Sequence, residues 1–293
     1  MNEALSALRF HIVVIAACAA LVFGTLFRGT TFVGVALVCG LDWCIVNLLN
    51  RATDVEEDRL NGIAATELVA RHARAIVVAT LAVLVGSLVL GFFVTTPALA
   101  SLRVLFHALG LGYSFRYVPT PRGRKRFKDL YGLKNGVSAF MFVLSVGFYP
   151  LLADGPPRTA SPAAIACVLA FFFLFEQSFE VLYDLRDVEG DTAVGVPTYP
   201  VVHGVEAAGR IVVGLCVVPI GVLVAGRLAR AITARELLMV AAPLAMLAFL
   251  RVRGPRNVSR ADCIGATYAG AGLLVVYLIG TTLWARAGLP QDL

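Results

Sequence analysis

Nine long apolar stretches divide this chain of 293 residues and limit its possible folds. Each stretch is too long for a β-strand and is rich in Leu, Val, Ala and Phe, which indicates helix. A helix needs about 20 apolar residues to cross the hydrocarbon core of a bilayer. The expected helices span residues 10–27, 31–50, 73–94, 98–113, 136–152, 162–183, 210–225, 237–250 and 263–284. We therefore expect an all-α, polytopic membrane protein with nine transmembrane helices in a bundle.

The composition agrees with this class. The chain is 59% hydrophobic and 15% charged, whereas soluble domains are about half apolar and a quarter charged. This balance excludes a secreted disulfide module, a disordered chain and a cytosolic α/β enzyme. The six cysteines all lie in apolar stretches without a CxxC pair, so we expect small core residues, with no disulfide and no metal ligand among them.

The placement of Lys and Arg predicts the orientation. With the N-terminus inside, 18 of the 25 basic residues face inside and 6 face outside, while Arg103 lies within a helix. Such a bias predicts an integral membrane protein with its N-terminus inside and its C-terminus outside. The loops that follow even-numbered helices are then in the cytoplasm. Topology accounts for the net charge of +6, so we expect no nucleic-acid partner.

Two short acidic segments repeat within the chain. Residues 54–63 (DVEEDRLNGI) match residues 187–196 (DVEGDTAVGV) at an offset of 133 residues. The offset equals four helices with their loops, so both segments follow an even-numbered helix and lie on the inside face. Repeats in polytopic proteins often enclose a binding site. We expect one domain over residues 1–293, with four-helix pseudo-repeats over about 1–134 and 135–260 around a central cavity.

The acids of these segments have helical spacing. No Gly or Pro interrupts residues 41–61, so the second helix is expected to run past the membrane surface with Asn50, Asp54 and Asp58 on one face. Asp187 and Asp191 are likewise one turn apart after the sixth helix. Oxygen ligands without His or Cys suit a hard cation such as Mg²⁺, which usually also binds substrate phosphates. The segments therefore indicate a phosphorylated lipid held through metal.

A basic loop lies on the same side of the membrane. Seven Lys and Arg residues fall between positions 116 and 134. They could neutralise the phosphate charge that the metals leave over. The loop could also be only a topology signal, or a contact for anionic lipid.

These motifs resemble those of the UbiA superfamily of intramembrane prenyltransferases. The first family motif is usually Asn-Asp-x-x-Asp-x-x-x-Asp, and this chain reads NRATDVEED over residues 50–58, with Arg51 in place of the usual Asp. The second motif reads DLRDVEGD over residues 184–191 and is followed by GVPT at 195–198. The basic loop, with Tyr113-Ser114 before it and GLKN at 132–135 after it, is also similar to the family.

The resemblance implies a nine-helix fold and a mechanism. Mg²⁺ would chelate a prenyl diphosphate, ionisation would give an allylic carbocation, and an aromatic or other lipid-soluble acceptor would attack it within the membrane. The residues implied as metal ligands are Asn50, Asp54, Asp58, Asp187 and Asp191, with Asp184 as a further candidate. The candidate diphosphate ligands are Arg51, Lys125, Arg126, Lys128 and Lys134. The implied partners are a prenyl diphosphate, the acceptor and membrane lipid.

Ionisable residues within the apolar stretches are further candidates, because such residues are usually functional. Asp42 lies two turns deeper than the first motif, and Glu176 and Glu180 lead towards the second. Arg103 and His107 are one turn apart on the fourth helix. Asp42 and Glu176 could form a structural ion pair with Arg103. Alternatively, either acid could orient the acceptor or take its proton, which makes both of them catalytic candidates.

Two other activities agree with the same residues. A terpene cyclase of the same fold would let the carbocation react with its own double bonds. A cation transporter would use the acids as ion sites.

Overall fold

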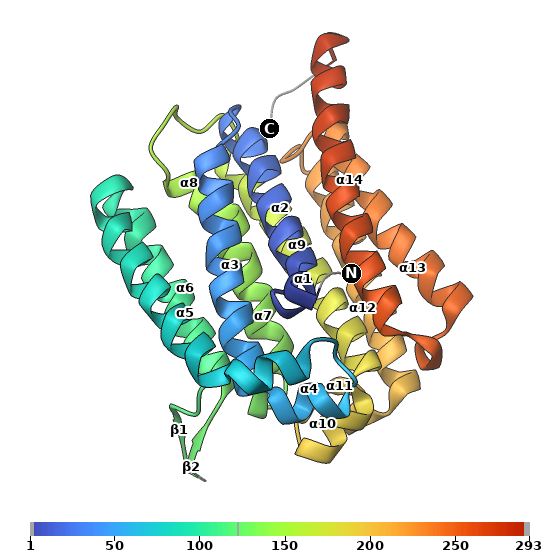
Figure 1. Cartoon of the computed structure of the whole chain (residues 1–293). Helices are drawn as coiled ribbons and strands as arrows, with labels where there is room; N and C mark the ends of the chain where they lie inside the picture. Colours follow the sequence, from blue (N-terminus) through green and yellow to red (C-terminus); the bar gives the residue numbers. More distant parts are fainter. Residues whose placement is uncertain (1–2, 122, 290–293) are drawn as a thin grey trace.

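Long helices form a bundle, as expected. The computed structural model describes residues 3–121 and 123–289, and each of the nine predicted stretches is helical (Figure 1). The helices that correspond to them are α2 (Phe10–Arg28), α3 (Val33–Thr53), α5 (Thr66–Val94), α6 (Pro97–Ser114), α7 (Leu133–Val143), α9 (Pro162–Arg186), α12 (Val205–Leu228), α13 (Ala241–Arg253) and α14 (Arg260–Arg286). A π-helical turn, Leu144–Phe148, and α8 (Tyr149–Leu152) continue α7.

Seven helical segments in the described part of the chain are long and apolar enough to cross a membrane. Six are α2, α3, α5, α9, α12 and α14, and the seventh spans Leu133–Leu152. Helix α13 has only 13 residues, and α6 carries Arg103 and His107. These two helices are outside the set of seven, so nine crossings stay a prediction.

Several short elements gather at one end of the bundle (Figure 1). They include α4 (Val55–Leu60), α10 (Val188–Val194) and α11 (Tyr199–His203). Strands β1 (Val118–Thr120) and β2 (Gly123–Lys125) form an antiparallel hairpin within the basic loop, followed by a 3-10 turn over Phe127–Asp129. Three other short elements occur elsewhere along the chain, namely α1 (Glu3–Ala7) and 3-10 segments at Ala234–Val240 and Pro255–Asn257.

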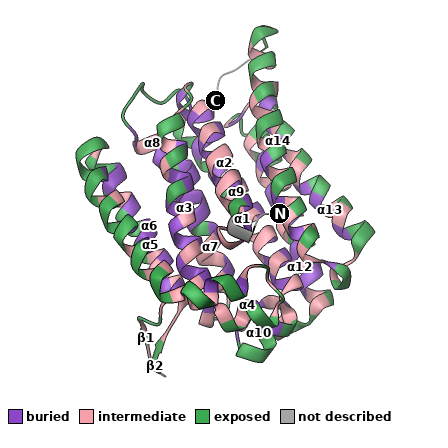
Figure 2. Ribbon diagram, in the orientation of Figure 1, coloured by how far each residue is buried: buried purple, intermediate pink, exposed green. Residues whose placement is uncertain are grey.

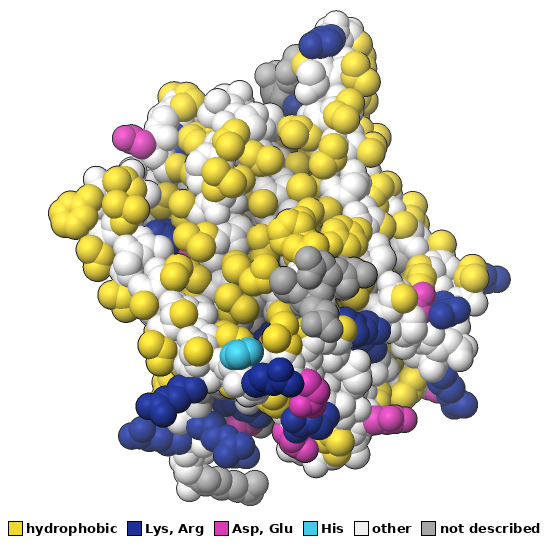
Figure 3. Space-filling model, in the orientation of Figure 1, with side chains coloured by type: hydrophobic (Ala, Val, Ile, Leu, Met, Phe, Trp, Pro, Cys, Tyr) yellow, Lys and Arg dark blue, Asp and Glu magenta, His cyan; other side chains and the backbone are white. Residues whose placement is uncertain are grey.

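The outer surface is that of an integral, multi-pass membrane protein. Figure 2 shows exposed residues along the outward faces of α5, α13 and α14, and large apolar side chains such as Phe93, Val276 and Leu283 are more than half exposed there. Figure 3 shows apolar side chains over most of the visible face and charged ones gathered at the end that carries the short elements. An apolar surface of this extent is suited to lipid. Inside, α2 packs between α3 and α14, and α9 packs between α7 and α12.

The second predicted helix does not run on as one helix, so that expectation is wrong. Helix α3 ends at Thr53, Asp54 leaves the helical region at φ −107° and ψ 21°, and α4 begins at Val55. Asp is a weak helix former, and ion pairs from the basic loop hold the Asp54 side chain. The same break occurs 133 residues later, where Asp187 has φ −99° and ψ 12° between α9 and α10.

The two breaks have the same backbone hydrogen bonds. The Ile63 amide donates to the Asp58 carbonyl at 2.8 Å, and the Val196 amide donates to the Asp191 carbonyl at 2.9 Å. The glycine before each amide is left-handed, with φ 60° at Gly62 and 74° at Gly195. The sequence repeat is therefore also a structural repeat at these segments. The wider pseudo-repeats over 1–134 and 135–260 stay a prediction.

Candidate active site

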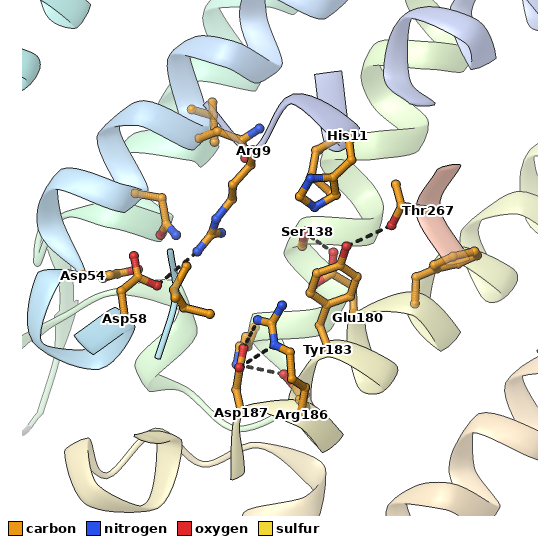
Figure 4. Close-up of a pocket in the computed structure, with 18 of the residues that line it drawn as sticks. Arg9, His11, Asp54, Asp58, Ser138, Glu180, Tyr183, Arg186, Asp187 and Thr267 are labelled. Atoms are coloured by element: carbon orange, nitrogen blue, oxygen red, sulfur yellow. Dashed lines mark hydrogen bonds and ion pairs between the residues drawn. The ribbon is translucent and has the colours of Figure 1, made fainter. Parts of the chain in front are cut away.

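A polar cavity lies inside the bundle at the end that carries the short elements (Figure 4). It encloses about 1450 Å³ of empty space, its open mouth included. Helices α2, α3, α4, α7, α9 and α14 supply its walls. Five of the six predicted metal ligands line it, namely Asn50, Asp54, Asp58, Asp184 and Asp187. The sixth, Asp191, is fully buried beside Lys134, which does line the cavity.

A hydrogen bond ties the two acidic segments together. The Gly190 amide of α10 donates to the Asn61 side-chain oxygen at the end of α4, at 2.9 Å. A Cβ atom at position 190 would lie 2.2 Å from that oxygen, so this approach requires glycine. The link holds residues 129 positions apart in sequence and fixes the two acidic segments on either side of one cavity.

The first segment is neutralised mainly by the basic loop. The Lys128 ammonium lies 2.6 Å from both Asp54 Oδ2 and Glu57 Oε2. Arg126 Nη1 donates to Asp54 Oδ1 at 2.9 Å. Burial would raise the pKa of Glu57, but the attraction of Lys128 holds that pKa below its usual value. The loop therefore supplies the counter-charges of Asp54 and Glu57 before any ligand enters.

The second segment is neutralised mainly by one lysine. Lys134 Nζ lies 2.8 Å from Asp184 Oδ1 and 3.1 Å from Asp191 Oδ2. Asn135 donates a further hydrogen bond to Asp184 at 2.8 Å. Burial raises the pKa of Asp191 to about 6, in spite of the opposing effect of Lys134. Asp187 pairs with Arg186, whose Nε donates to it at 2.6 Å.

The five predicted diphosphate ligands occupy different places. Lys128 and Lys134 line the cavity. Arg126 binds Asp54 and Asp129 and is absent from the cavity wall, as is Lys125 at the end of β2. Arg51 is fully buried and binds Asp58 and the Ala64 carbonyl, so it too is absent from the wall.

Three arginines in the cavity wall were missed as ligands from the sequence. Arg9, Arg186 and Arg260 all line the cavity. Arg9 reaches Asp58 at 3.3 Å from a left-handed backbone position with φ 47° and ψ 48°, and Figure 4 shows its side chain directed between the acids. Arg260 donates to the Ser6 hydroxyl at 3.0 Å. Only Arg186 carried a signal, because it lies within the second motif.

The two candidate catalytic acids are in different surroundings. Asp42 forms a two-pronged ion pair with Arg103, at 2.7 and 2.9 Å. It also contacts His107 at 3.0 Å and accepts from the Tyr149 hydroxyl at 2.9 Å. This is the structural ion pair that the sequence left open, and Asp42 is outside the cavity wall. Glu176 does line the cavity.

A second cavity adjoins the first and lies in the apolar part of the bundle. It encloses about 1040 Å³ of empty space between α2, α9, α13 and α14. Phe142, Glu176 and Phe179 belong to the walls of both cavities, and Phe171, Phe172 and Phe175 line the apolar one. A charged compartment therefore lies beside an aromatic one, and Glu176 stands at the boundary.

The donor atoms fit a hard cation, although the carboxylates do not form a ready cluster. Within the described residues, no group of three or more Asp, Glu, His or Cys side chains is placed to hold a metal on its own. Basic side chains lie between the acids instead. However, Asn50 Oδ1 and Asp191 Oδ1 are buried without a hydrogen-bond partner, and orphaned buried oxygens of this kind suit a cation that binds oxygen.

Comparisons with known proteins agree on one family. The sequence matches the UbiA prenyltransferase family over residues 10–268. A UbiA homolog from Archaeoglobus fulgidus bound to DMAPP and Mg²⁺ has a TM-score of 0.71 and 19% sequence identity, over 94% of this chain and 97% of that chain. The same homolog bound to GPP and Mg²⁺ has a TM-score of 0.69 and 18% identity, over 94% and 98%.

A further similar structure is that of a digeranylgeranylglyceryl phosphate synthase. It has a TM-score of 0.62 and 16% identity, over 96% of this chain and 99% of that chain. No curated protein matches the sequence. At these identities, the solved structures show a shared fold.

Proposed function

Because the chain belongs to the UbiA prenyltransferase family, we propose that it transfers a prenyl group from a prenyl diphosphate to an aromatic or other nucleophilic acceptor within the membrane, with Mg²⁺ as cofactor. The family that the motifs indicated and the all-α membrane fold predicted from the apolar stretches are confirmed. The reaction and the roles of individual residues are our proposal.

The observation that carries this proposal is the pair of adjoining cavities. A prenyl diphosphate has a highly charged head and an apolar tail, and the two compartments have matching character. The charged compartment holds both acidic segments and four cationic side chains besides Arg260, namely Arg9, Lys128, Lys134 and Arg186. The aromatic compartment has the apolar lining that an isoprenoid chain needs.

The acids and the basic residues would divide the work of binding the head. Asn50, Asp54, Asp58, Asp184, Asp187 and Asp191 would hold Mg²⁺, which neutralises charge on the departing diphosphate. Lys128 and Lys134 each contact two carboxylates. When these carboxylates bind a cation, both lysines would be free to turn to the diphosphate oxygens, where negative charge increases as the C–O bond breaks.

The aromatic compartment would protect the allylic carbocation. The faces of Phe171, Phe175 and Phe179 stabilise positive charge and exclude water. Glu176, at the boundary between the cavities, is the acid that we propose accepts the proton that the acceptor loses. We also propose that the cavity mouth faces the cytoplasm and that the N-terminus lies inside, because the basic residues concentrate at the end of the bundle that holds the mouth.

The test is a screen of the purified chain in detergent against DMAPP, GPP and longer prenyl diphosphates, each with a panel of phenolic acceptors. We expect a prenylated acceptor by mass spectrometry, together with released diphosphate, and loss of both when a chelator removes Mg²⁺. A cyclic hydrocarbon formed without any acceptor would contradict transfer and indicate a terpene cyclase. Cation uptake by proteoliposomes that needs no diphosphate would indicate a transporter instead.

A further inference from the structure

Three residues before the two acidic segments, one pair of equivalent positions carries opposite charges. Arg51 and Asp184 are 133 residues apart, and so are Asp58 and Asp191, which both lie in the short helices. In the second segment, the two equivalent acids share the ammonium of Lys134, at 2.8 and 3.1 Å. In the first segment, the Arg51 guanidinium binds Asp58 directly. The second segment thus receives its cation from α7, whereas the cation of the first segment comes from α3, the helix directly before it.

Arg51 is fixed in its place. Its side chain is fully buried, Nη1 donates to Asp58 Oδ2, and Nη2 donates to the Ala64 carbonyl at 2.8 Å. Separating a buried charge from its partners is strongly unfavourable. Lys134 is different, because it reaches the acids from α7 on a flexible stem and lines the cavity. Its ammonium can exchange acids for phosphate, whereas the Arg51 guanidinium cannot leave.

Asp58 is therefore neutralised before any ligand enters. Arg51 binds one of its oxygens, and Arg9 lies 3.3 Å from the other. A divalent cation beside Asp58 would meet the positive charge of Arg51 and a carboxylate with one oxygen already used. Coulomb repulsion at such short range is large in a buried site.

We propose that Arg51 takes the place of a metal ion at Asp58, so that, of the six metal ligands proposed above, Asp184, Asp187 and Asp191 bind most of the divalent cation. This rests on the proposed function, because it assumes a cation-dependent diphosphate site. Arg51 acts here through Asp58 as a positioning residue, and its fixed charge replaces part of the neutralisation that a second metal would provide.

The test measures Mn²⁺ affinity by isothermal titration of the full chain in detergent, with inorganic diphosphate present. Arg51→Gln removes the charge, so we expect Mn²⁺ to bind about tenfold more tightly or better. Arg51→Lys keeps the charge, so its affinity should stay close to that of the unmodified chain. The matched control is Arg59→Gln, which removes a charge from the exposed side of α4 and should leave the affinity within about twofold.

Unchanged or weaker binding in a folded Arg51→Gln chain would overturn the proposal, as would equal affinities in the Gln and Lys variants. If Arg51→Gln does not fold, a second comparison decides. Asp191→Asn should weaken Mn²⁺ binding by a factor about ten times larger than Asp58→Asn does. Equal losses of affinity in the two variants would overturn the proposal. No Mn²⁺ binding by the unmodified chain with diphosphate would instead contradict the proposed function itself.

Discussion

The first acidic segment, around Asp54, and the second, around Asp187, have the same backbone but different counter-charges. In both, a long helix ends at an aspartate and a short helix begins at the next residue. The acids of the first segment pair with several basic side chains, namely the buried Arg51, Arg9 and residues of the basic loop. The second depends on Lys134 and Arg186. A repeated backbone therefore places two sets of oxygens around one cavity without giving them the same chemistry.

The difference indicates a division of roles within one cavity. Acids whose counter-ion is a single movable lysine are free to exchange it for a metal. Acids whose counter-ions are several and fixed keep the structure of the site instead. If this is right, equivalent substitutions in the two segments should have unequal effects, and the following predictions rank them by their effect on turnover.

The largest effect is expected from Asp191→Asn. Losing one anionic oxygen donor at the second segment should lower turnover by about 10³-fold, because the charge on the departing diphosphate loses its metal-bound stabilisation. The measurement is product formation by mass spectrometry at saturating prenyl diphosphate. The control, Glu189→Gln, changes an exposed acid of the same short helix and should stay within about twofold. Near-normal turnover in Asp191→Asn would mean that the cation binds elsewhere.

A smaller effect is expected when the lysines are compared. Lys134→Met removes the main counter-ion of the second segment, so kcat/KM for the prenyl diphosphate should fall about 100-fold. In Lys128→Met, kcat/KM should fall only about tenfold, because Arg126 still pairs with Asp54. Steady-state kinetics over a range of diphosphate concentrations would measure both. Equal losses would remove the asymmetry between the segments.

The link between the segments should matter less than the charges. Asn61→Ala removes the acceptor for the Gly190 amide, so the acids should be less well placed and kcat/KM should fall about tenfold. Asn61→Asp keeps an acceptor oxygen and should restore most of the activity. Failure of the Asp variant to recover, in a chain that unfolds at the normal temperature, would show that the hydrogen bond is not what places the acids.

The smallest effect on chemistry is expected from Asp42→Asn. Breaking the buried pair with Arg103 should cost about 3 kcal/mol of stability, which thermal unfolding in detergent would detect. Turnover per folded molecule should stay within about threefold, because Asp42 is outside the cavity wall. A loss of activity far beyond this in fully folded protein would restore Asp42 as a catalytic residue and leave the cavity incompletely assigned.

The helices and both acidic segments were predictable from the sequence because apolar length and residue spacing determine them locally. The break at Asp54 was not predictable, because no Gly or Pro marks it. The ion pairs that hold the Asp54 side chain come from Arg126 and Lys128, about 70 residues away. For the same reason, the sequence suggested acids gathered around a metal, whereas in the fold each of the five predicted aspartate ligands has a basic partner.

The basic residues show the same limit. Lys128 and Lys134 lie in the wall as predicted candidates, but Lys125 and Arg126, which are their neighbours in the loop, do not. Which side of the hairpin faces the cavity depends on tertiary packing. Arg9 was treated only as a topology signal, and its left-handed backbone, which directs the side chain into the cavity, has no marker in the local sequence.

The bond between Arg260 and Ser6 joins residues 254 positions apart, and it has a consequence for how the protein is made. Helix α14 supplies Ile264 and Thr267 to the cavity wall. A growing chain therefore contains every acid of both segments before the residues that complete this wall are added. A chain that lacked α14 would leave the acids without this part of their cover.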